Sequence, residues 1–162
     1  EVVIKPVVSA SAKGAFRLDA RSARERAGDV EAYFANRALL AQPFVPAVVA
    51  EGEFSLMYFN GEHSHTILKT PKAGDFRVQE EHGGDIRAVP TEPALHAAGR
   101  RALAAIGEAP LYARADFVRT GDGAFALMEL ELIEPSLYFR TDPPSAERFA
   151  RALHERMARA RA

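Results

Sequence analysis

The sequence predicts a protein of the α+β class, built on an antiparallel β-sheet with helices packed on one face. Two β-hairpins and one helix support this prediction. The first hairpin spans residues 54–70, where Asn60-Gly61 separates two strand-like runs, and Asn-Gly readily adopts the positive φ angles of a type I′ turn. The second spans residues 112–132, where apolar and charged residues alternate on both sides of a Thr-Gly-Asp-Gly turn, as half-buried strands require. The helix, at residues 91–107, has an apolar stripe of helical spacing.

The remaining elements follow from local signals along the chain. Residues 1–8 are expected to form a short buried strand that Pro6 ends or confines to a sheet edge, because proline has no N–H to donate. Asp29 and Thr91 are the expected N-caps of two helices, since their side-chain oxygens can accept from the first backbone amides. The expected strands are 1–8, 16–18, 39–44, 54–60, 63–70, 112–118 and 125–132, and the expected helices are 29–38, 91–107 and 145–159, the last with Phe149, Leu153 and Met157 on its apolar face.

Composition restricts the class of protein. The 162 residues are 48% hydrophobic and 27% charged, as in an ordinary globular domain with a sizeable core. The formal net charge of −1 does not indicate a nucleic-acid or membrane-surface binder. There is no cysteine, and no apolar run approaches the ~18 residues of a membrane span, so we expect a cytoplasmic protein. Abundant alanine and arginine with little lysine suggest a GC-rich bacterial genome.

The 112–132 hairpin carries the most informative charges. Alternation places Arg114 and Asp116 on one face of its first strand, and Glu129 and Glu131 on one face of its second. Carboxylates on neighbouring strands repel one another unless their pKa values rise or a cation lies between them. Magnesium takes oxygen ligands and keeps coordination positions for phosphate oxygens. We therefore predict a magnesium site at the three acids, the alternative being that they face solvent on an exposed sheet surface.

This hairpin resembles the metal-binding hairpin of the ATP-grasp superfamily, in which an R-x-D strand is followed by an E-x-E or E-x-N strand. Glu131 stands where Asn is the commoner residue, and residues 133–136 (Ile-Glu-Pro-Ser) follow in place of the usual Pro-Gly turn. The likeness covers nearly the whole chain. The stretches FSLMYFNGEHSHTILKTPKAGDFRVQEEHGG and LMELELIEPSLYF are most similar to glutathione-synthetase-like proteins and to the cyclising ligase type of cycloserine biosynthesis. The resemblance implies an ATP-grasp fold incomplete at the N-terminus, with residues 1–162 as the C-terminal part of the nucleotide-binding domain and the N-terminal substrate domain absent from the chain.

The resemblance also implies which residues contact the nucleotide. In the superfamily a lysine strand and a loop of small residues contact the phosphates, a hinge binds adenine, and an acid holds the ribose. Val45 is the expected donor to adenine, because Pro43 lacks an N–H, and Glu53 is preferred over Glu51 for the ribose. The matching residues are Lys5, Ser9, Ser11, Lys13 and Gly14 for the phosphates, Gln42, Phe44 and Val45 for adenine, Glu51 or Glu53 for the ribose, and Lys69 beneath the phosphates.

Two arginines are the catalytic residues that the resemblance implies. Arg77, in a D-F-R loop, would meet an acyl-phosphate or a substrate carboxylate, and Arg114 would stabilise the tetrahedral intermediate. The implied function is ATP-dependent joining of a carboxylate to an amine or similar nucleophile through an acyl-phosphate. The implied cofactors are ATP and Mg²⁺, with Mn²⁺ as a substitute. The partners would be small-molecule carboxylates and amines, with no nucleic acid or membrane, and a homodimer is possible. By itself the chain is expected to be inactive.

Two other functions compete with a ligase. A degenerate ATP-grasp domain could bind nucleotide as a regulatory or scaffolding module, but it would not need both Arg77 and Arg114. A metal-dependent hydrolase could use the acidic hairpin, but it would leave the loop after Lys5 unexplained. His63 and His65 are expected to share a strand face, yet without a third ligand nearby they do not predict a zinc site.

Overall fold

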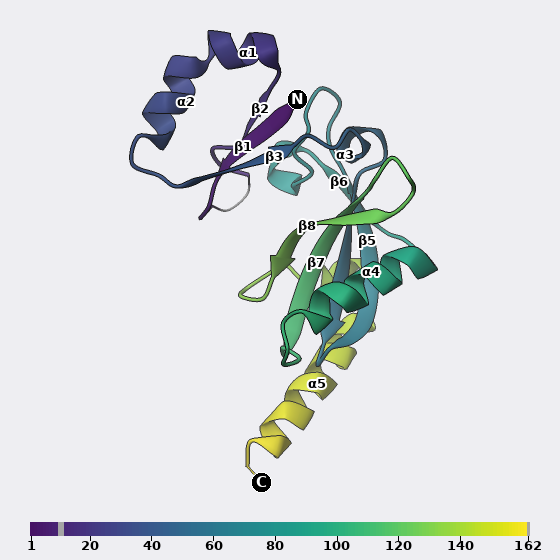
Figure 1. The fold of residues 1–162 in the computed structure, drawn as a ribbon. Coiled ribbons are helices and arrows are strands. Elements are labelled where there is room, and N and C mark those ends of the chain that lie inside the picture. Colours follow the sequence, from purple (N-terminus) through teal and green to yellow (C-terminus); the bar gives the residue numbers. More distant parts are fainter. Residues whose placement is uncertain (10–11, 162) are drawn as a thin grey trace. The chain divides into compact units, whose positions relative to one another are not determined.

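The structure, a computed structural model, describes residues 1–9 and 12–161. The chain divides into two compact units, Glu1–Pro46 and Ala47–Ala162. Each unit contains an antiparallel sheet of its own (Figure 1). The α+β class and the antiparallel sheet that the sequence predicts are confirmed.

The first unit is built on three antiparallel strands in the order β2-β1-β3. They are β1 (Val2–Pro6), β2 (Phe16–Leu18) and β3 (Leu39–Pro43). All three strands expected in this part of the chain are therefore present. Pro6 is the last residue of β1, which fits a residue that cannot donate to a neighbouring strand.

Two short helices, α1 (Ala20–Glu25) and α2 (Ala27–Phe34), connect β2 to β3. Helix α1 was not predicted from the sequence. Its N-cap is Asp19, whose carboxylate accepts from the backbone N–H of Ser22 at 2.7 Å while the Ser22 hydroxyl accepts from the Asp19 N–H at 2.8 Å, which is a capping box. The predicted N-cap at Asp29 is wrong, because α2 begins two residues earlier and Asp29 lies in its first turn.

The second unit is built on five antiparallel strands in the order β6-β5-β4-β7-β8. Both predicted hairpins are present, as the β4–β5 and β7–β8 pairs. Asn60 and Gly61 have φ angles of 49° and 83°, the positive values that a type I′ turn needs. The strands are β4 (Glu53–Phe59), β5 (Glu62–Thr70), β6 (Asp85–Ala88), β7 (Tyr112–Arg119) and β8 (Phe125–Glu131), of which β6 was not predicted.

Helix α4 (Pro93–Ala104) lies across one face of the five-stranded sheet (Figure 1). Its N-cap is Glu92 rather than the predicted Thr91, because the Thr91 hydroxyl instead bonds the hydroxyl of Thr66 on β5 at 2.7 Å. The hydrophobic core of the unit lies beneath this helix and consists of Phe54, Leu56, Tyr58, Leu68, Leu95, Ala98, Ala113, Ala115 and Phe117.

Helix α5 (Ser145–Arg159) has the bounds that the sequence predicts. The ring of Phe149 packs 5.3 Å from that of Phe59, at the end of β4. The rest of the predicted apolar stripe does not pack as expected, because Leu153 and Met157 are 37% and 48% exposed. The remaining short elements are α3 (Ala47–Ala50) and two 3₁₀ turns, Glu80–His82 and Phe139–Thr141.

The prediction that His63 and His65 share a strand face is wrong. The register between β4 and β5 shifts between Met57 and Tyr58, which pair with His65 and His63 respectively. This β-bulge inserts one residue and reverses the alternation. His63 consequently bonds the hydroxyl of Thr66 at 2.9 Å, whereas His65 bonds the carbonyl of Leu137 at 3.0 Å.

Candidate active site

The sheet face opposite α4 carries a group of buried polar side chains. The even-numbered residues of β4 belong to the core, so alternation directs Glu53 and Ser55 to the opposite face. Lys69 on β5 is the cross-strand partner of Glu53, and Asp116 on β7 is the partner of Ser55. Ser55, Asp116 and Lys69 are only 0%, 1% and 3% exposed. Charged groups this deeply buried require partners.

A continuous ionic network joins these side chains. The Nζ of Lys69 lies 2.5 Å from an Oε1 of Glu53 and 3.1 Å from the Oδ2 of Asp116. Arg114 donates from Nε to Oδ1 of Asp116 at 3.1 Å and from Nη2 to Oδ2 at 3.0 Å. The same guanidinium also pairs with Glu131 on β8. The network therefore crosses four neighbouring strands, β5, β4, β7 and β8.

The three acids of the hairpin come together as the alternation predicts. Asp116 is the cross-strand partner of Glu129, and Arg114 is the partner of Glu131. One carboxylate oxygen from each acid lies within 4.8 Å of the others. Their environments are graded, because Asp116 is buried, Glu131 is partly buried and Glu129 is exposed. The group is thus anchored in the sheet at one end and open to solvent at the other.

This group suits a magnesium ion in both distance and charge. Bonds of about 2.1 Å from oxygen to Mg²⁺ place two ligands of one ion about 3–4 Å apart, so small side-chain movements would close the observed separations. Together with Glu53, the acids number four, against the two cations Lys69 and Arg114. Acidic side chains therefore predominate in this group, as they do at sites that bind a divalent cation.

The pKa shifts in the network indicate where a further positive charge would act. Burial, the largest single influence, raises the pKa of Asp116, whereas the charges of Lys69 and Arg114 lower it. The two cations together outweigh burial, so the pKa of Asp116 lies below its usual value. Burial raises the pKa of Glu53 and of Glu131 despite those same cations. Asp116 is therefore a ready anionic ligand, whereas Glu53 and Glu131 would gain from another cation nearby.

Glu53 and Glu51 have different surroundings. Gly52, with φ of 120°, separates them, and a side chain there would approach the Lys69 carbonyl to 2.5 Å, so this close turn into β4 requires glycine. Glu51 pairs with Arg119 at 3.0 Å, and Arg119 also pairs with Glu92 at 2.6 Å. Of the two acids considered for the ribose, only Glu53 joins the network that contains Asp116.

Arg77 lies in the loop between β5 and β6, where it pairs with Asp75. It donates from Nη2 to Oδ2 of Asp75 at 2.7 Å. Asp75 also accepts from the backbone N–H groups of Phe76 and Arg77 at 2.7 and 3.0 Å. The hydrogen bond from Arg77 is the largest of the effects that hold the pKa of Asp75 far below its usual range, so the D-F-R segment forms a compact ionic turn.

The expected phosphate loop lies in the first unit, after β1. Lys5 is on β1 and half-buried, whereas Lys13 is exposed. The Ser9 hydroxyl donates to the Lys13 carbonyl at 2.7 Å, which draws the two ends of the loop together. Gly14 has φ of 73°, and a side chain there would strike the Tyr33 ring. Ser11 lies outside the described residues.

The expected adenine hinge is the end of β3. Gln42 is the cross-strand partner of Val3 on β1. The Phe44 N–H donates to the Glu1 carbonyl at 3.1 Å, and Pro43 has none to donate. Of the backbone amides just after Gln42, that of Val45 therefore remains the one expected to reach adenine.

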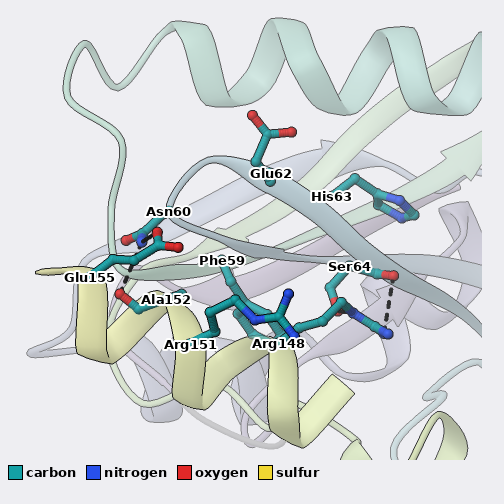
Figure 2. Close-up of a pocket in the computed structure, with 9 residues that line it drawn as sticks. All are labelled: Phe59, Asn60, Glu62, His63, Ser64, Arg148, Arg151, Ala152 and Glu155. Carbon is teal, nitrogen blue, oxygen red and sulfur yellow. Dashed lines mark hydrogen bonds between the residues drawn. The ribbon is translucent and has the colours of Figure 1, made fainter. Parts of the chain in front are cut away.

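A shallow cavity of about 280 Å³ lies elsewhere in the second unit, between α5 and the β4–β5 turn (Figure 2). Arg148 lines this cavity and donates from Nε to the Ser64 hydroxyl at 2.9 Å. Asn60 donates to the Ala152 carbonyl at 2.9 Å. These bonds hold α5 to the sheet, and the lining contains no member of the ionic network.

Comparisons with known proteins identify the fold. No protein-family model matches the chain. The cycloserine biosynthesis protein DcsG of Streptomyces lavendulae is 34% identical over 171 residues, which cover 97% of this chain and 55% of that protein. A solved structure of D-cycloserine synthetase DcsG superposes with a TM-score of 0.82 at 32% identity, over 96% of this chain and 55% of that one. The chain has the ATP-grasp fold.

More distant ATP-grasp structures share the fold. The ATP-grasp ligase PsnB, solved with a precursor variant, Mg and ADP, has a TM-score of 0.62 at 16% identity, over 93% of this chain and 46% of that one. The D-alanine–D-alanine ligase of Bacillus anthracis has a TM-score of 0.66 at 16% identity, over 99% of this chain and 55% of that one. The chain spans about half the length of the relatives that it matches. Among the described residues, no helix combines the length and apolarity needed to cross a membrane.

Two residues beside the ionic network were not predicted from the sequence. Ser55 is fully buried opposite Asp116. Tyr138 follows the hairpin with a φ of 48°, a left-handed conformation that non-glycine residues rarely adopt. Burial raises the pKa of Tyr138, and the charges of Lys69 and Arg114 also act on its phenol. Serine in an apolar strand was the available signal for the first, whereas nothing in the sequence indicates the backbone of the second.

Proposed function

We propose that the full-length protein containing this chain is a magnesium-dependent ATP-grasp ligase that joins a carboxylate to an amine or a similar nucleophile. In this reaction the γ-phosphoryl group of ATP passes to the carboxylate oxygen and ADP leaves. The acyl-phosphate is then attacked by the nucleophile, and inorganic phosphate is released. The observation that carries the proposal is the convergence of Asp116, Glu129 and Glu131 around one point beside Arg114.

The acids are proposed to hold the metal, and the basic residues to hold the phosphates. Bound Mg²⁺ would neutralise β- and γ-phosphate charge, and Mn²⁺ offers a similar oxygen-seeking substitute. Lys69 is buried between two acids, so its ammonium is fixed in place rather than free to follow solvent. A charge held in this way costs no reorganisation when negative charge develops on the transferring phosphoryl group.

Arg114 is proposed to stabilise the tetrahedral intermediate. Arg114 is 7% exposed, and Asp116 and Glu131 orient its guanidinium. The N–H groups of the guanidinium that do not bond these acids therefore point in a fixed direction. Arg77 is proposed to contact the acyl-phosphate or the substrate carboxylate, which a planar fork can bind through two parallel hydrogen bonds. Asp75 would orient that fork in the absence of substrate.

Residues of the first unit are proposed to bind the rest of the nucleotide. Lys5 and the loop 9–14 would contact the phosphates, because backbone amides in such a loop form an anion-binding concavity. Gln42, Phe44 and Val45 would contact adenine through the hinge. Glu53 is preferred for the ribose, because Glu51 is already engaged by Arg119.

The likeness to DcsG, PsnB and D-alanine–D-alanine ligase favours amino acids and peptides as the substrates to test. The decisive experiment measures ADP release by the full-length protein with Mg²⁺, ATP and paired sets of carboxylates and amines. ADP release that needs the metal, a carboxylate and an amine together supports a ligase. Tight ATP binding without turnover in any pairing would instead support the alternative of a nucleotide-binding module. A protein of this kind would work in the cytoplasm, where ATP is supplied.

A further inference from the structure

The hydroxyl of Ser55 is an unpaired polar group at the centre of the ionic network. Ser55 is 0% exposed, and its Oγ makes no hydrogen bond of full geometry within the described residues. On one side its cross-strand neighbour is the apolar Ile67, and on the other it is Asp116. Burial, the largest influence on the pKa of Asp116, raises that pKa. The charges of Lys69 and Arg114, the hydrogen bond from Arg114 and, last, a contact from the Ser55 hydroxyl lower it. The carboxylate of Asp116 therefore lies within reach of this hydroxyl.

An unpaired buried hydroxyl destabilises a folded protein, because the group loses its hydrogen bonds to water and gains none in return. Alanine at this position would avoid that cost, and the neighbouring residues of β4 are large and apolar. A serine here therefore indicates a state of the protein in which the hydroxyl does have a partner. Among the described residues, Asp116 is the carboxylate at the position paired with Ser55 on the neighbouring strand β7.

The present partners of Asp116 hold its carboxylate in one orientation. Oδ1 accepts from Arg114, and Oδ2 accepts from both Lys69 and Arg114. Sharing an oxygen with a cation would draw electron density from these bonds and turn the carboxylate. An O–H donor on the neighbouring strand could then fix the new orientation without adding charge, which a second ammonium or guanidinium could not do.

We infer that Ser55 is a positioning residue for Asp116, donating a hydrogen bond to its carboxylate when that carboxylate holds a divalent cation. This inference rests on the proposed function, because it takes Asp116 as a metal ligand. Groups that orient a metal ligand typically alter metal affinity by about 10–100-fold when they are removed. The inference therefore separates two properties that a purely structural residue would change together, namely metal binding and the stability of the metal-free fold.

The experiment compares Ser55→Ala and Ser55→Thr with wild type in the full-length protein. Binding of Mn²⁺ in the presence of a non-hydrolysable ATP analogue is measured by electron paramagnetic resonance, and thermal unfolding is measured in EDTA. We expect Ser55→Ala to weaken Mn²⁺ binding by about tenfold, with Tm in EDTA unchanged or a few degrees higher. Ser55→Thr keeps the hydroxyl and should bind Mn²⁺ within about threefold of wild type.

Thr66→Val is the matched control, because Thr66 is also buried but bonds His63 and Thr91 on the opposite face. It should lower Tm and leave Mn²⁺ binding unchanged. Unchanged Mn²⁺ binding in Ser55→Ala overturns the inference, and so does weaker binding accompanied by a markedly lower Tm in EDTA. If wild type itself fails to bind Mn²⁺ with the analogue, the proposed function fails first, so the two failures are distinguishable.

Discussion

The ammonium group of Lys69 on β5 lies 3.1 Å from a carboxylate oxygen of Asp116 on β7, with β4 running between the two strands. Lys69 also pairs with Glu53 on that intervening strand, at 2.5 Å. One cation therefore links acids from two further strands at a place where water is excluded. Because these three side chains are buried, their contribution to the stability of the fold depends on each charge keeping its partner.

Asp116→Asn tests the metal assignment. Asparagine keeps the shape of the side chain but removes its charge, so a divalent cation would lose the most deeply buried of its three proposed ligands. We expect metal-dependent ATP turnover by the full-length protein to fall at least 100-fold, measured as ADP release at saturating ATP. Asp122→Asn is the control, because Asp122 is an exposed turn residue of the same hairpin. Wild-type turnover in Asp116→Asn would remove the metal assignment.

Lys69→Met tests the buried ion pairs. Methionine fills a similar volume but leaves Glu53 and Asp116 facing each other without their shared cation, so the free energy of unfolding should fall by about 3–5 kcal/mol at pH 8. Without Lys69, the pKa values of both acids in the folded variant rise above the unfolded values, so the folded state binds more protons. Stability of the variant should then increase, relative to wild type, as the pH falls from 8 to 5.

Urea unfolding at the two pH values provides the measurement for Lys69→Met. Lys72→Met is the control, because Lys72 is exposed in the following loop, and its effect should be small at both values. A second variant, Lys69→Met with Glu53→Gln, should recover part of the lost stability, because it removes one of the two carboxylates that no longer pair with Lys69. A pH-independent loss in Lys69→Met would show that packing, and not charge, explains the effect.

Local patterns predicted the acidic hairpin well, because both of its determinants lie close together in the sequence. Alternation assigns Asp116 and Glu129 to definite faces, and a short turn at residues 120–123 brings the two strands into register. The helix at residues 145–159 was predictable for a similar reason, since Pro143-Pro144 marks its start.

Features that depend on distant or irregular contacts were not predictable in this way. The pairing of β4 with β7 joins residues about 60 positions apart, so nothing in the neighbourhood of Ser55 indicates that Asp116 is its partner. The bulge opposite Met57 changes the face of His63, and one inserted residue leaves no mark in the alternation. Thr91 is a good N-cap by type, but tertiary bonding to Thr66 takes its hydroxyl away from the helix.

Glu53→Gln and Glu51→Gln separate the two acids considered for the ribose. Glu53 is the member of the buried network, so its substitution should raise KM for ATP by about tenfold in the full-length protein. Glu51 pairs with Arg119 at the surface, so Glu51→Gln should lower the free energy of unfolding by about 0.5–1 kcal/mol and leave KM for ATP unchanged. Steady-state kinetics and urea unfolding of both variants test this, and a raised KM in Glu51→Gln alone would reverse the assignment.

The ring of His63 makes the stability of the second unit depend on pH. Burial, followed by the charges of His96 and His65, lowers the pKa of His63 to about 4, while its Nε2 bonds the Thr66 hydroxyl at 2.9 Å. Because the folded pKa lies below the unfolded value of about 6.5, the unfolded state binds more protons between these values. The contribution of neutral His63 to the free energy of unfolding is therefore fully present above pH 6.5 and is lost as the pH falls towards 4.

We expect this loss to amount to about 1–2 kcal/mol, after allowance for solvent screening of a ring that is only half-buried. His63→Gln can keep the bond to Thr66 without titrating, so its urea midpoint should change less than that of wild type between pH 7 and pH 4.5. Part of the slope will persist, because burial also lowers the pKa of His65. His154→Gln, at an exposed position on α5, should leave the wild-type slope intact. An equal slope in wild type and His63→Gln would show that protonation of this ring does not oppose folding.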